Sequence, residues 1–435
     1  MRLVRPRYDR PRQPSRSLAV RIAALAVLLA VGELALTAHA ASVMWHRFFG
    51  LWDMTPIALA FGLVVIAGAA LAAAVSREAL LRYATCTVAV ATVWIALEVA
   101  GLAGIVSWPA LLARPGSEIG TRRTPYLDVS GVTKPDIAER WGLQSRPVEF
   151  RYHTDRHGFR SAVDRESAEI YLVGDSMLVA ALLPYEQTLA ARLEAEIGRP
   201  VMNVALIGIG PQEEAELFRE SGLDAAGALV VQVIFEGNDL RDSKVWRERL
   251  AGTPPALPRE QQTLTFQLLR RLRRLTQPVP SGVTDRACEI GGVPYYIFWG
   301  AASRAQREDD PAQVTTAIEA LRDDVEKGGG AFAVVFVPSK LRSLGPLCAW
   351  KDDRVLAPSA ANPTPLRDAL LAWSERSGVP VLDLTAPLVE SARGGHIPWF
   401  ADDTHWNAEG VAVAARAMRD WDALRAVRDG DSTRR

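Results

Sequence analysis

Apolar residues gather in three stretches near the N-terminus, at about 18–38, 55–75 and 81–105. Each stretch reaches the roughly 20 residues that an α-helix needs to cross a hydrocarbon core about 30 Å thick. The first stretch is long and two more follow it, which argues against a cleaved signal peptide. The pattern therefore predicts a membrane anchor with three transmembrane helices in residues 1–107.

The basic residues around these stretches predict the orientation of the anchor. Arginine and lysine are enriched on the cytoplasmic side of membrane helices. Arg77 and Arg82 lie between the second and third stretches. Six more arginines precede the first stretch: Arg2, Arg5, Arg7, Arg10, Arg12 and Arg16. We therefore expect a multi-pass protein of the cytoplasmic (inner) membrane, with the chain after about Trp108 on the periplasmic or extracytoplasmic side.

Two carboxylates, Glu33 and Glu98, fall inside the predicted spans. Counted from the inner ends at about 1.5 Å per residue, both lie near the outer interface. An acid inside a membrane segment is a candidate functional group. Because of their depth, we expect both side chains to reach interfacial water instead.

Beyond a connector at 108–165, which ends with a short strand at 148–152, short apolar runs alternate with amphipathic stretches. Such alternation predicts a parallel sheet covered by helices, that is, a three-layer α/β/α sandwich. The sandwich spans 166–425, with an insertion at about 241–305 and a polar tail at 426–435. Its strands are predicted at 170–173, 201–206, 228–235, 331–337 and 379–384, and its helices at 188–197, 212–220, 311–327, 364–377 and 408–424.

Charge and cysteine content narrow the function classes. The 50 basic and 50 acidic residues cancel, which argues against a nucleic-acid partner. The histidines and cysteines show no metal-ligand spacing, so no metal and no cofactor are expected. Cys288 and Cys348 lie in the part expected outside the cytoplasm, where they can form a disulfide or remain two unpaired thiols.

Residues that can take part in catalysis follow three of the predicted strands. Ser176 follows the first strand, Gly208 the second and Asn238 the third. The carboxyl ends of parallel strands meet at one edge of the sheet, where ligands bind. A serine on such a turn lies near free backbone amides that can stabilise an oxyanion, and an asparagine amide can add another donor. Each of these residues alone also suits an ordinary turn.

A second group of candidate residues stands near the C-terminus. Asp402 and Asp403 precede His405 by three and two positions. A carboxylate can hold one nitrogen of an imidazole while the other nitrogen takes the proton of a serine hydroxyl. Both aspartates are candidates for this role.

Ser176, Gly208, Asn238 and His405, in this order, resemble the four signature residues of the SGNH/GDSL hydrolase superfamily. The resemblance covers about 165–425, and the Asp-Thr-His-Trp-Asn segment at 403–407 is similar to the alginate O-acetyltransferase-like branch. It implies that Ser176 is the nucleophile and that His405 acts as base and then as acid. It also implies an oxyanion hole built from the backbone amides of Ser176 and Gly208 and from the Asn238 side chain.

Two positions depart from the family pattern. Glu236 stands two residues before Asn238, where the family often has glycine. Many members place the acid three residues before the histidine, which points to Asp402, whereas the acetyltransferase-like branch places it two residues before, which points to Asp403. Because the neighbouring Thr-His-Trp-Asn matches that branch, we favour Asp403.

The expected function is that of a serine esterase or O-acyltransferase. Its substrate would be an acylated glycan outside the cytoplasm, or a small ester, and the acyl group an O-acetyl group. The lipid bilayer and a membrane-bound acyl-transfer protein are the expected partners. The alternative is a non-catalytic glycan-binding or scaffold module of a membrane complex that modifies polysaccharides.

Overall fold

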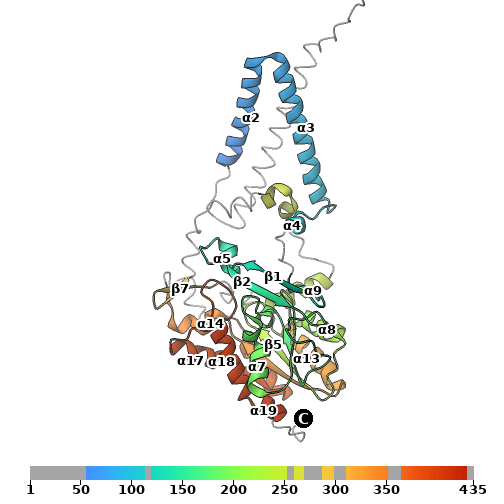
Figure 1. Cartoon of the computed structure of the whole chain (residues 1–435), viewed down its shortest axis with the longest axis vertical. Coiled ribbons are helices and arrows are strands. Elements are labelled where there is room, and N and C mark those ends of the chain that lie inside the picture. The colour runs from blue at the N-terminus through green and yellow to red at the C-terminus, as the bar shows by residue number, and fades with distance from the viewer. Residues whose placement is uncertain are drawn as a thin grey trace, which may run out of the picture. The chain divides into compact units, whose positions relative to one another are not determined.

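The computed structural model describes residues 55–112, 119–251, 259–268, 287–297, 310–350 and 364–428 (Figure 1). The chain divides into two compact units. The first comprises Met1–Arg114 and Ala256–Leu275, and the second comprises Pro115–Pro255 and Thr276–Arg435. The predicted insertion at 241–305 is therefore not one body, because its middle part belongs to the N-terminal unit.

Two packed helices form the described core of the N-terminal unit, α2 (Thr55–Val75) and α3 (Arg77–Leu102). Ser76 begins α3, because its hydroxyl accepts a hydrogen bond from the Ala79 N–H at 3.0 Å. In the described part of the chain, α3 is the one helix that is long and apolar enough to cross a membrane. The predicted second span is helical over its whole range, as α2, and Val65–Val75 is the part of it whose side chains the structure describes.

The predicted three-helix anchor is therefore not supported beyond this one helix. The first predicted span, at 18–38, lies outside the described residues, as does Glu33. A three-span anchor remains a prediction.

Glu98 on α3 is half-buried and has partners within the protein that the sequence did not indicate. Its carboxylate accepts hydrogen bonds from the backbone N–H groups of Leu264, at 3.0 Å, and Thr265, at 2.8 Å, and also from the Thr265 hydroxyl. The Trp94 indole donates to the same hydroxyl at 3.0 Å. Backbone N–H groups that are removed from water need acceptors. Glu98 supplies an acceptor for the segment that folds against α3, which is a structural reason for an acid at this position.

A five-stranded parallel sheet forms the centre of the second unit and confirms the predicted α/β fold. The strand order is β10-β8-β5-β3-β4. The chain begins with β3, places β4 on one side of it, and then places β5, β8 and β10 in turn on the other side. A ligand site is expected where the connections diverge, beyond the carboxyl ends of β3 and β5. The strands are β3 (Ile170–Gly174), β4 (Val201–Ala205), β5 (Leu229–Phe235), β8 (Ala331–Val337) and β10 (Val381–Asp383).

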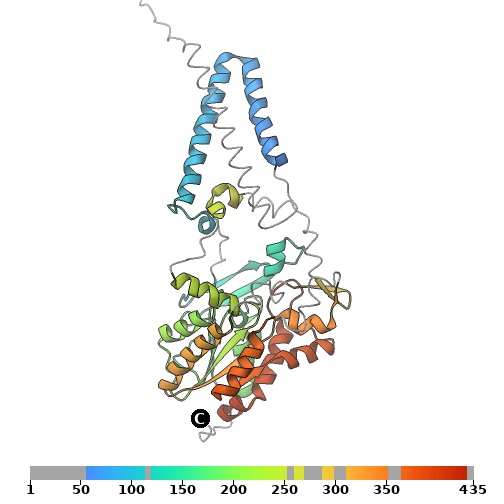
Figure 2. The ribbon, with the colours of Figure 1, turned by 180° about the vertical axis from the view of Figure 1, so that it is seen from behind.

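Helices cover both faces of this sheet, as Figures 1 and 2 show. Successive residues of a strand point to opposite faces. Ile170 and Leu172 accordingly join the apolar cluster of one face, and Tyr171 and Val173 join that of the other. The helices of the first face are α7 (Leu189–Ile197), α17 (Thr385–Arg393) and α18 (Ala408–Arg419), and those of the second are α8 (Pro211–Ser221), α13 (Ala312–Lys327) and α16 (Leu366–Ser377).

Several elements differ from the prediction. The connector is structured, because β1 (Asp128–Thr133) pairs with β2 (Val148–His153) on either side of α5 (Asp136–Trp141). The predicted last helix is divided into α18 and α19 (Asp422–Arg428). Helix α17 was not among the predicted helices; it holds Pro387 in its first turn, where proline is tolerated.

A second, antiparallel sheet contains Cys288, and Cys348 directly precedes one of its strands. It is ordered β7 (Val293–Tyr296), β6 (Ala287–Ile290), β9 (Ala349–Trp350). Cys288 and Cys348 form a disulfide that closes a loop of 60 residues. Disulfides of this kind persist mainly outside the cytoplasm.

Loss of this disulfide should destabilise the protein. A closed loop of this length restricts the unfolded chain, so we expect Cys348→Ser to lower the free energy of unfolding by about 2–4 kcal/mol. Urea denaturation of the full chain in detergent, with and without dithiothreitol, measures the loss. Cys86→Ser is the matched control, because Cys86 is an exposed free thiol. Equal stability of the Cys348 and Cys86 variants would contradict the prediction.

Candidate active site

Ser176 lies where β3 turns into a short helix at the carboxyl edge of the sheet. The helix is α6 (Ser176–Val179), and the Asp175 side chain caps it by accepting from the Met177 N–H at 2.9 Å. A Cβ atom at Gly174 would lie 2.9 Å from Leu178 and 3.1 Å from the Val233 carbonyl. Glycine there lets the turn approach β5 closely, which leaves the serine beside the divergence of β3 and β5.

His405 connects Ser176 to a buried carboxylate. Its Nε2 lies 2.9 Å from Ser176 Oγ, and its Nδ1 lies 2.6 Å from Asp403 Oδ1. The Trp406 indole donates to the Met177 carbonyl at 3.0 Å and so joins the histidine segment to the serine turn. Ser176 thus forms one hydrogen-bonded relay with Asp403 and His405, which lie close together in sequence but 229 positions from the serine in the case of His405. This is the arrangement of a nucleophilic serine with its base and acid.

The structure brings Asp403, and not Asp402, against the His405 ring. Asp403 is 2% exposed and points at the His405 ring. Asp402 instead uses its backbone carbonyl, which accepts from the Ala138 N–H at 3.0 Å.

Opposite charges dominate the titration of the relay. Burial by itself lowers the pKa of His405, but the charge and hydrogen bond of Asp403 outweigh it and raise that pKa to about 9. Burial would likewise raise the pKa of Asp403, yet the facing His405 and the hydrogen bonds to the carboxylate hold it well below its usual range. Asp403 is therefore ionised at neutral pH, and His405 must lose a proton before it can act as a base.

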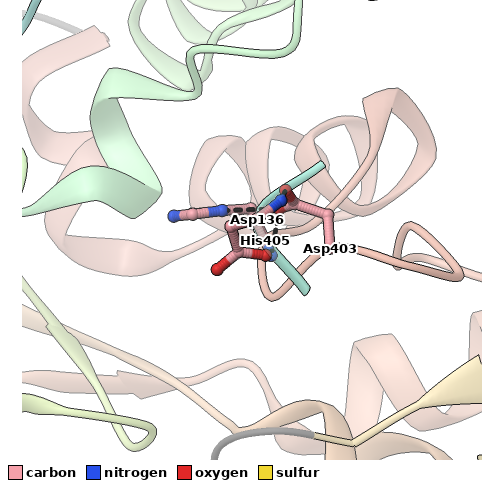
Figure 3. Close-up of side chains that lie close together, drawn as sticks. All are labelled: Asp136, Asp403 and His405. Atoms are coloured by element: carbon pink, nitrogen blue, oxygen red, sulfur yellow. Dashed lines mark hydrogen bonds and ion pairs between the residues drawn. The ribbon is translucent and has the colours of Figure 1, made fainter. Parts of the chain in front are cut away.

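Two residues that the sequence did not single out hold the loop of Asp403. The backbone N–H of Asp136 donates to Asp403 Oδ2 at 2.6 Å (Figure 3). The Lys340 ammonium donates to the Asp403 carbonyl at 2.6 Å and to the Tyr296 carbonyl at 3.0 Å. Burial lowers the pKa of Lys340 to about 8, against the opposing effect of Asp403. Neither residue belongs to a local motif, because both contacts join distant parts of the chain.

The residues predicted to complete the oxyanion hole lie at neighbouring strand ends. Gly208 follows β4, is exposed and has a φ of 80°, a left-handed conformation that favours glycine. Asn238 follows β5, and its amide nitrogen donates to Asp175 Oδ2 at 3.2 Å and to Asp242 Oδ2 at 2.8 Å. Since the opposite amide orientation would face an oxygen toward two carboxylates, both amide hydrogens are committed to these acids.

A group of buried acids surrounds this asparagine. Burial raises the pKa of Asp175, and burial together with neighbouring carboxylates raises the pKa of Glu214 and Asp239. Burial also raises the pKa of Asp242, to about 6, although the hydrogen bond from Asn238 opposes it. The orientation of Asn238 therefore depends on carboxylates that are costly to keep charged.

Glu236, the departure from the family pattern, has a structural explanation. Its carboxylate forms a buried ion pair with Arg342, whose Nη2 lies 2.6 Å from Oε1. It also accepts from the Ser339 N–H at 2.9 Å and from the Thr364 hydroxyl at 3.0 Å. The acid thus joins the loops after β5 and β8 and takes no part in the relay.

Within the described residues, Asp136, Asp403 and His405 form the one group of potential metal ligands, with donor atoms within 4.8 Å of one another. Two of these atoms, His405 Nδ1 and Asp403 Oδ1, already share a hydrogen bond, and His405 Nε2 faces Ser176. The group is therefore better explained as part of the serine relay than as a metal centre.

Residues 290–429 match the family model described as the SGNH hydrolase-like domain of the acetyltransferase AlgX. The matched range contains Asp403 and His405, whereas Ser176 precedes it. The resemblance to the SGNH/GDSL hydrolases is confirmed by this match, which covers residues 290–429. Within that superfamily, its C-terminal part is similar to the AlgX acetyltransferase domain.

Solved structures of low sequence identity also resemble this chain. A putative lipolytic protein of the G-D-S-L family from Desulfitobacterium hafniense DCB-2 is 12% identical, with 57% of this chain and 98% of that chain covered and a TM-score of 0.31. The protein YXIM from Bacillus subtilis is also 12% identical, with 66% and 68% covered and a TM-score of 0.33. No curated protein sequence matches the chain.

Proposed function

We propose that this chain is a membrane-anchored serine esterase or O-acyltransferase with Ser176 as its nucleophile. The observation that carries the proposal is the continuous relay from Ser176 Oγ through His405 to Asp403, with distances of 2.9 Å and 2.6 Å. A serine becomes nucleophilic when an oriented imidazole can accept its proton. The match of residues 290–429 to an acetyltransferase domain supports an acetyl group as the transferred unit.

In the proposed reaction, Ser176 Oγ attacks the ester carbonyl while its proton moves to His405 Nε2. The tetrahedral oxyanion collapses, the bond to the alcohol breaks, and His405 returns the proton to the leaving alcohol. This leaves an acyl-Ser176 ester. Water or a sugar hydroxyl then gives its proton to His405 and attacks the acyl carbon. The bond from that carbon to Ser176 Oγ breaks, and His405 returns the proton to Oγ. Hydrolysis and transfer differ only in this second nucleophile.

The proposed oxyanion hole uses the backbone N–H groups of Ser176 and Gly208 together with the Asn238 amide. Asn238 must first exchange one of its two carboxylate bonds for the oxyanion. The bond to Asp175 is the longer of the two, at 3.2 Å against 2.8 Å for Asp242, so we expect that bond to open. One donor of this kind typically contributes about 10²–10³-fold to kcat.

The proposed substrate is an O-acetylated glycan outside the cytoplasm. The disulfide between Cys288 and Cys348 supports an oxidising compartment for the catalytic domain. The apolar helix α3 supports attachment to a membrane. We further propose three spans with the catalytic domain on the outer side, and an acyl-transfer protein in the same membrane as donor.

A fluorophosphonate probe tests whether Ser176 is activated. Such probes react with serines whose proton is taken by a base, so we expect the full chain in detergent to be labelled and Ser176→Ala to remain unlabelled. In-gel fluorescence after short incubation measures the reaction. A well-folded wild type that resists labelling would instead favour the glycan-binding or scaffold module.

Replacement of the two neighbouring aspartates separates the acid of the relay from its neighbour. We expect Asp403→Asn to lower kcat by about 10⁴-fold, because the imidazole loses the partner that selects its tautomer. Steady-state hydrolysis of p-nitrophenyl acetate measures this, and Asp402→Asn should stay near wild type. Comparable losses of kcat in Asp403→Asn and Asp402→Asn would contradict the assignment.

Wild-type kcat/KM in the same assay should rise with pH toward about 9, since His405 must be neutral to accept a proton.

A further inference from the structure

Asp136 makes three hydrogen bonds to the segment that carries the relay, although 267 residues separate it from Asp403. Its backbone N–H donates to Asp403 Oδ2 at 2.6 Å. Its carboxylate accepts from the Thr404 N–H at 2.7 Å and from the Thr404 hydroxyl at 2.6 Å. Figure 3 shows Asp136 beside Asp403 and the imidazole of His405. The contact is therefore reciprocal, with donors and acceptors on both sides.

Helix α5 is fixed in place independently of these bonds. Ile137 and Ala138 are each 1% exposed and belong to a small apolar cluster of their own. Trp141 meets Tyr296 edge to face, with ring centroids 6.3 Å apart. The Tyr296 N–H in turn donates to the Ala401 carbonyl at 2.8 Å. The segment around Asp403 is thus held between α5 and β7, so Asp136 is a fixed partner of the relay.

The Thr404 hydroxyl gives Asp136 its specific influence on His405. Thr404 Oγ1 lies 3.3 Å from His405 Nδ1, the same nitrogen that faces Asp403. While the hydroxyl hydrogen points at Asp136, Thr404 presents only lone pairs to Nδ1. A proton on Nδ1 is then favoured, and Nε2 remains free to accept the proton of Ser176. Without Asp136, the hydroxyl can donate to Nδ1 and favour the opposite tautomer.

The charges around His405 also raise its pKa. The carboxylates of Asp403, Asp136 and Asp175 all raise the pKa of His405, in that order of effect. The Lys340 ammonium, which donates to the Asp403 carbonyl, is also under the influence of the Asp403 and Asp136 carboxylates. Burial, followed by the charge of Asp403, raises the pKa of Asp136 itself.

We propose that Asp136 is a positioning residue of the active site, which holds the Thr404 hydroxyl away from His405 and so reinforces the tautomer that Asp403 favours and that can deprotonate Ser176. The proposal rests on the proposed function of Ser176 and His405. It adds to the SGNH-like domain a residue from the segment that precedes it, outside the range matched by the AlgX model.

The pH dependence of fluorophosphonate labelling tests this role on the full chain in detergent. Asp136→Asn keeps the size of the side chain and the backbone bond to Asp403, but removes the charge and one acceptor. We expect its limiting rate constant to fall on the order of tenfold to hundredfold. Loss of a nearby negative charge should also move the alkaline rise of the rate to lower pH by about one unit.

Substitutions of Thr404 test the same bond from its other end and leave α5 intact. Thr404→Ser keeps the hydroxyl and should remain near wild type. Thr404→Val in the Asp136→Asn background removes the competing donor, so we expect the double variant to be faster than Asp136→Asn alone. Glu139→Gln, a change of charge on the same helix, is the matched control and should leave both the rate and its pH dependence unchanged.

Each outcome has one meaning. A rate lowered together with its pH dependence shifted supports the proposal, as does rescue by Thr404→Val. A lowered rate with the pH dependence unshifted, or an unaltered rate, overturns it while the function of Ser176 stands. If Asp136→Asn does not fold, Thr404→Val alone decides: without a hydroxyl that can donate to Nδ1 its rate should stay near wild type, and a lowered rate overturns the proposal. Absence of labelling in the wild type overturns the proposed function and this proposal with it.

Discussion

The burial of an ionised carboxylate, that of Asp403, is the constraint on which the rest of the site depends. An isolated charge removed from water is strongly disfavoured unless hydrogen bonds and opposite charges replace its hydration. Here the His405 imidazole and backbone, the Asp136 backbone N–H and the nearby Lys340 ammonium meet that need. Elements from three separate parts of the chain converge on this loop for that reason.

The parallel sheet provides the other half of the arrangement. Because β3 lies between β4 and β5, the residues that follow these three strands meet at one edge. Ser176 stands at the divergence of the connections, and the Trp406 indole brings the histidine loop to it. The ion pair of Glu236 with Arg342 then fixes the neighbouring loops without entering the chemistry. The ion pair that fixes these loops is therefore distinct from the residues of the relay.

The features of this molecule that depend on local sequence pattern can be predicted from the sequence. Short apolar runs predict the five parallel strands, and the order of Ser176 and His405 predicts where the chemistry lies. The contributions of Asp136 and Lys340 could not be predicted, because their contacts join positions far apart and neither stands in a motif. The orientation of Asn238 could not be predicted either, since it depends on Asp242, one turn further along a helix. Glu98 shows the same limit in the N-terminal unit, where a segment from a distant insertion supplies the partners.

In the proposed reaction, Ser176 carries the acyl group between the two steps. Mass spectrometry of the full chain, quenched in acid shortly after mixing with p-nitrophenyl acetate, detects such an intermediate. We expect one acetyl group on the peptide that contains Ser176, formed in the wild type and absent in His405→Ala. An acetyl group on another residue, or ester turnover without any adduct on Ser176, would contradict it.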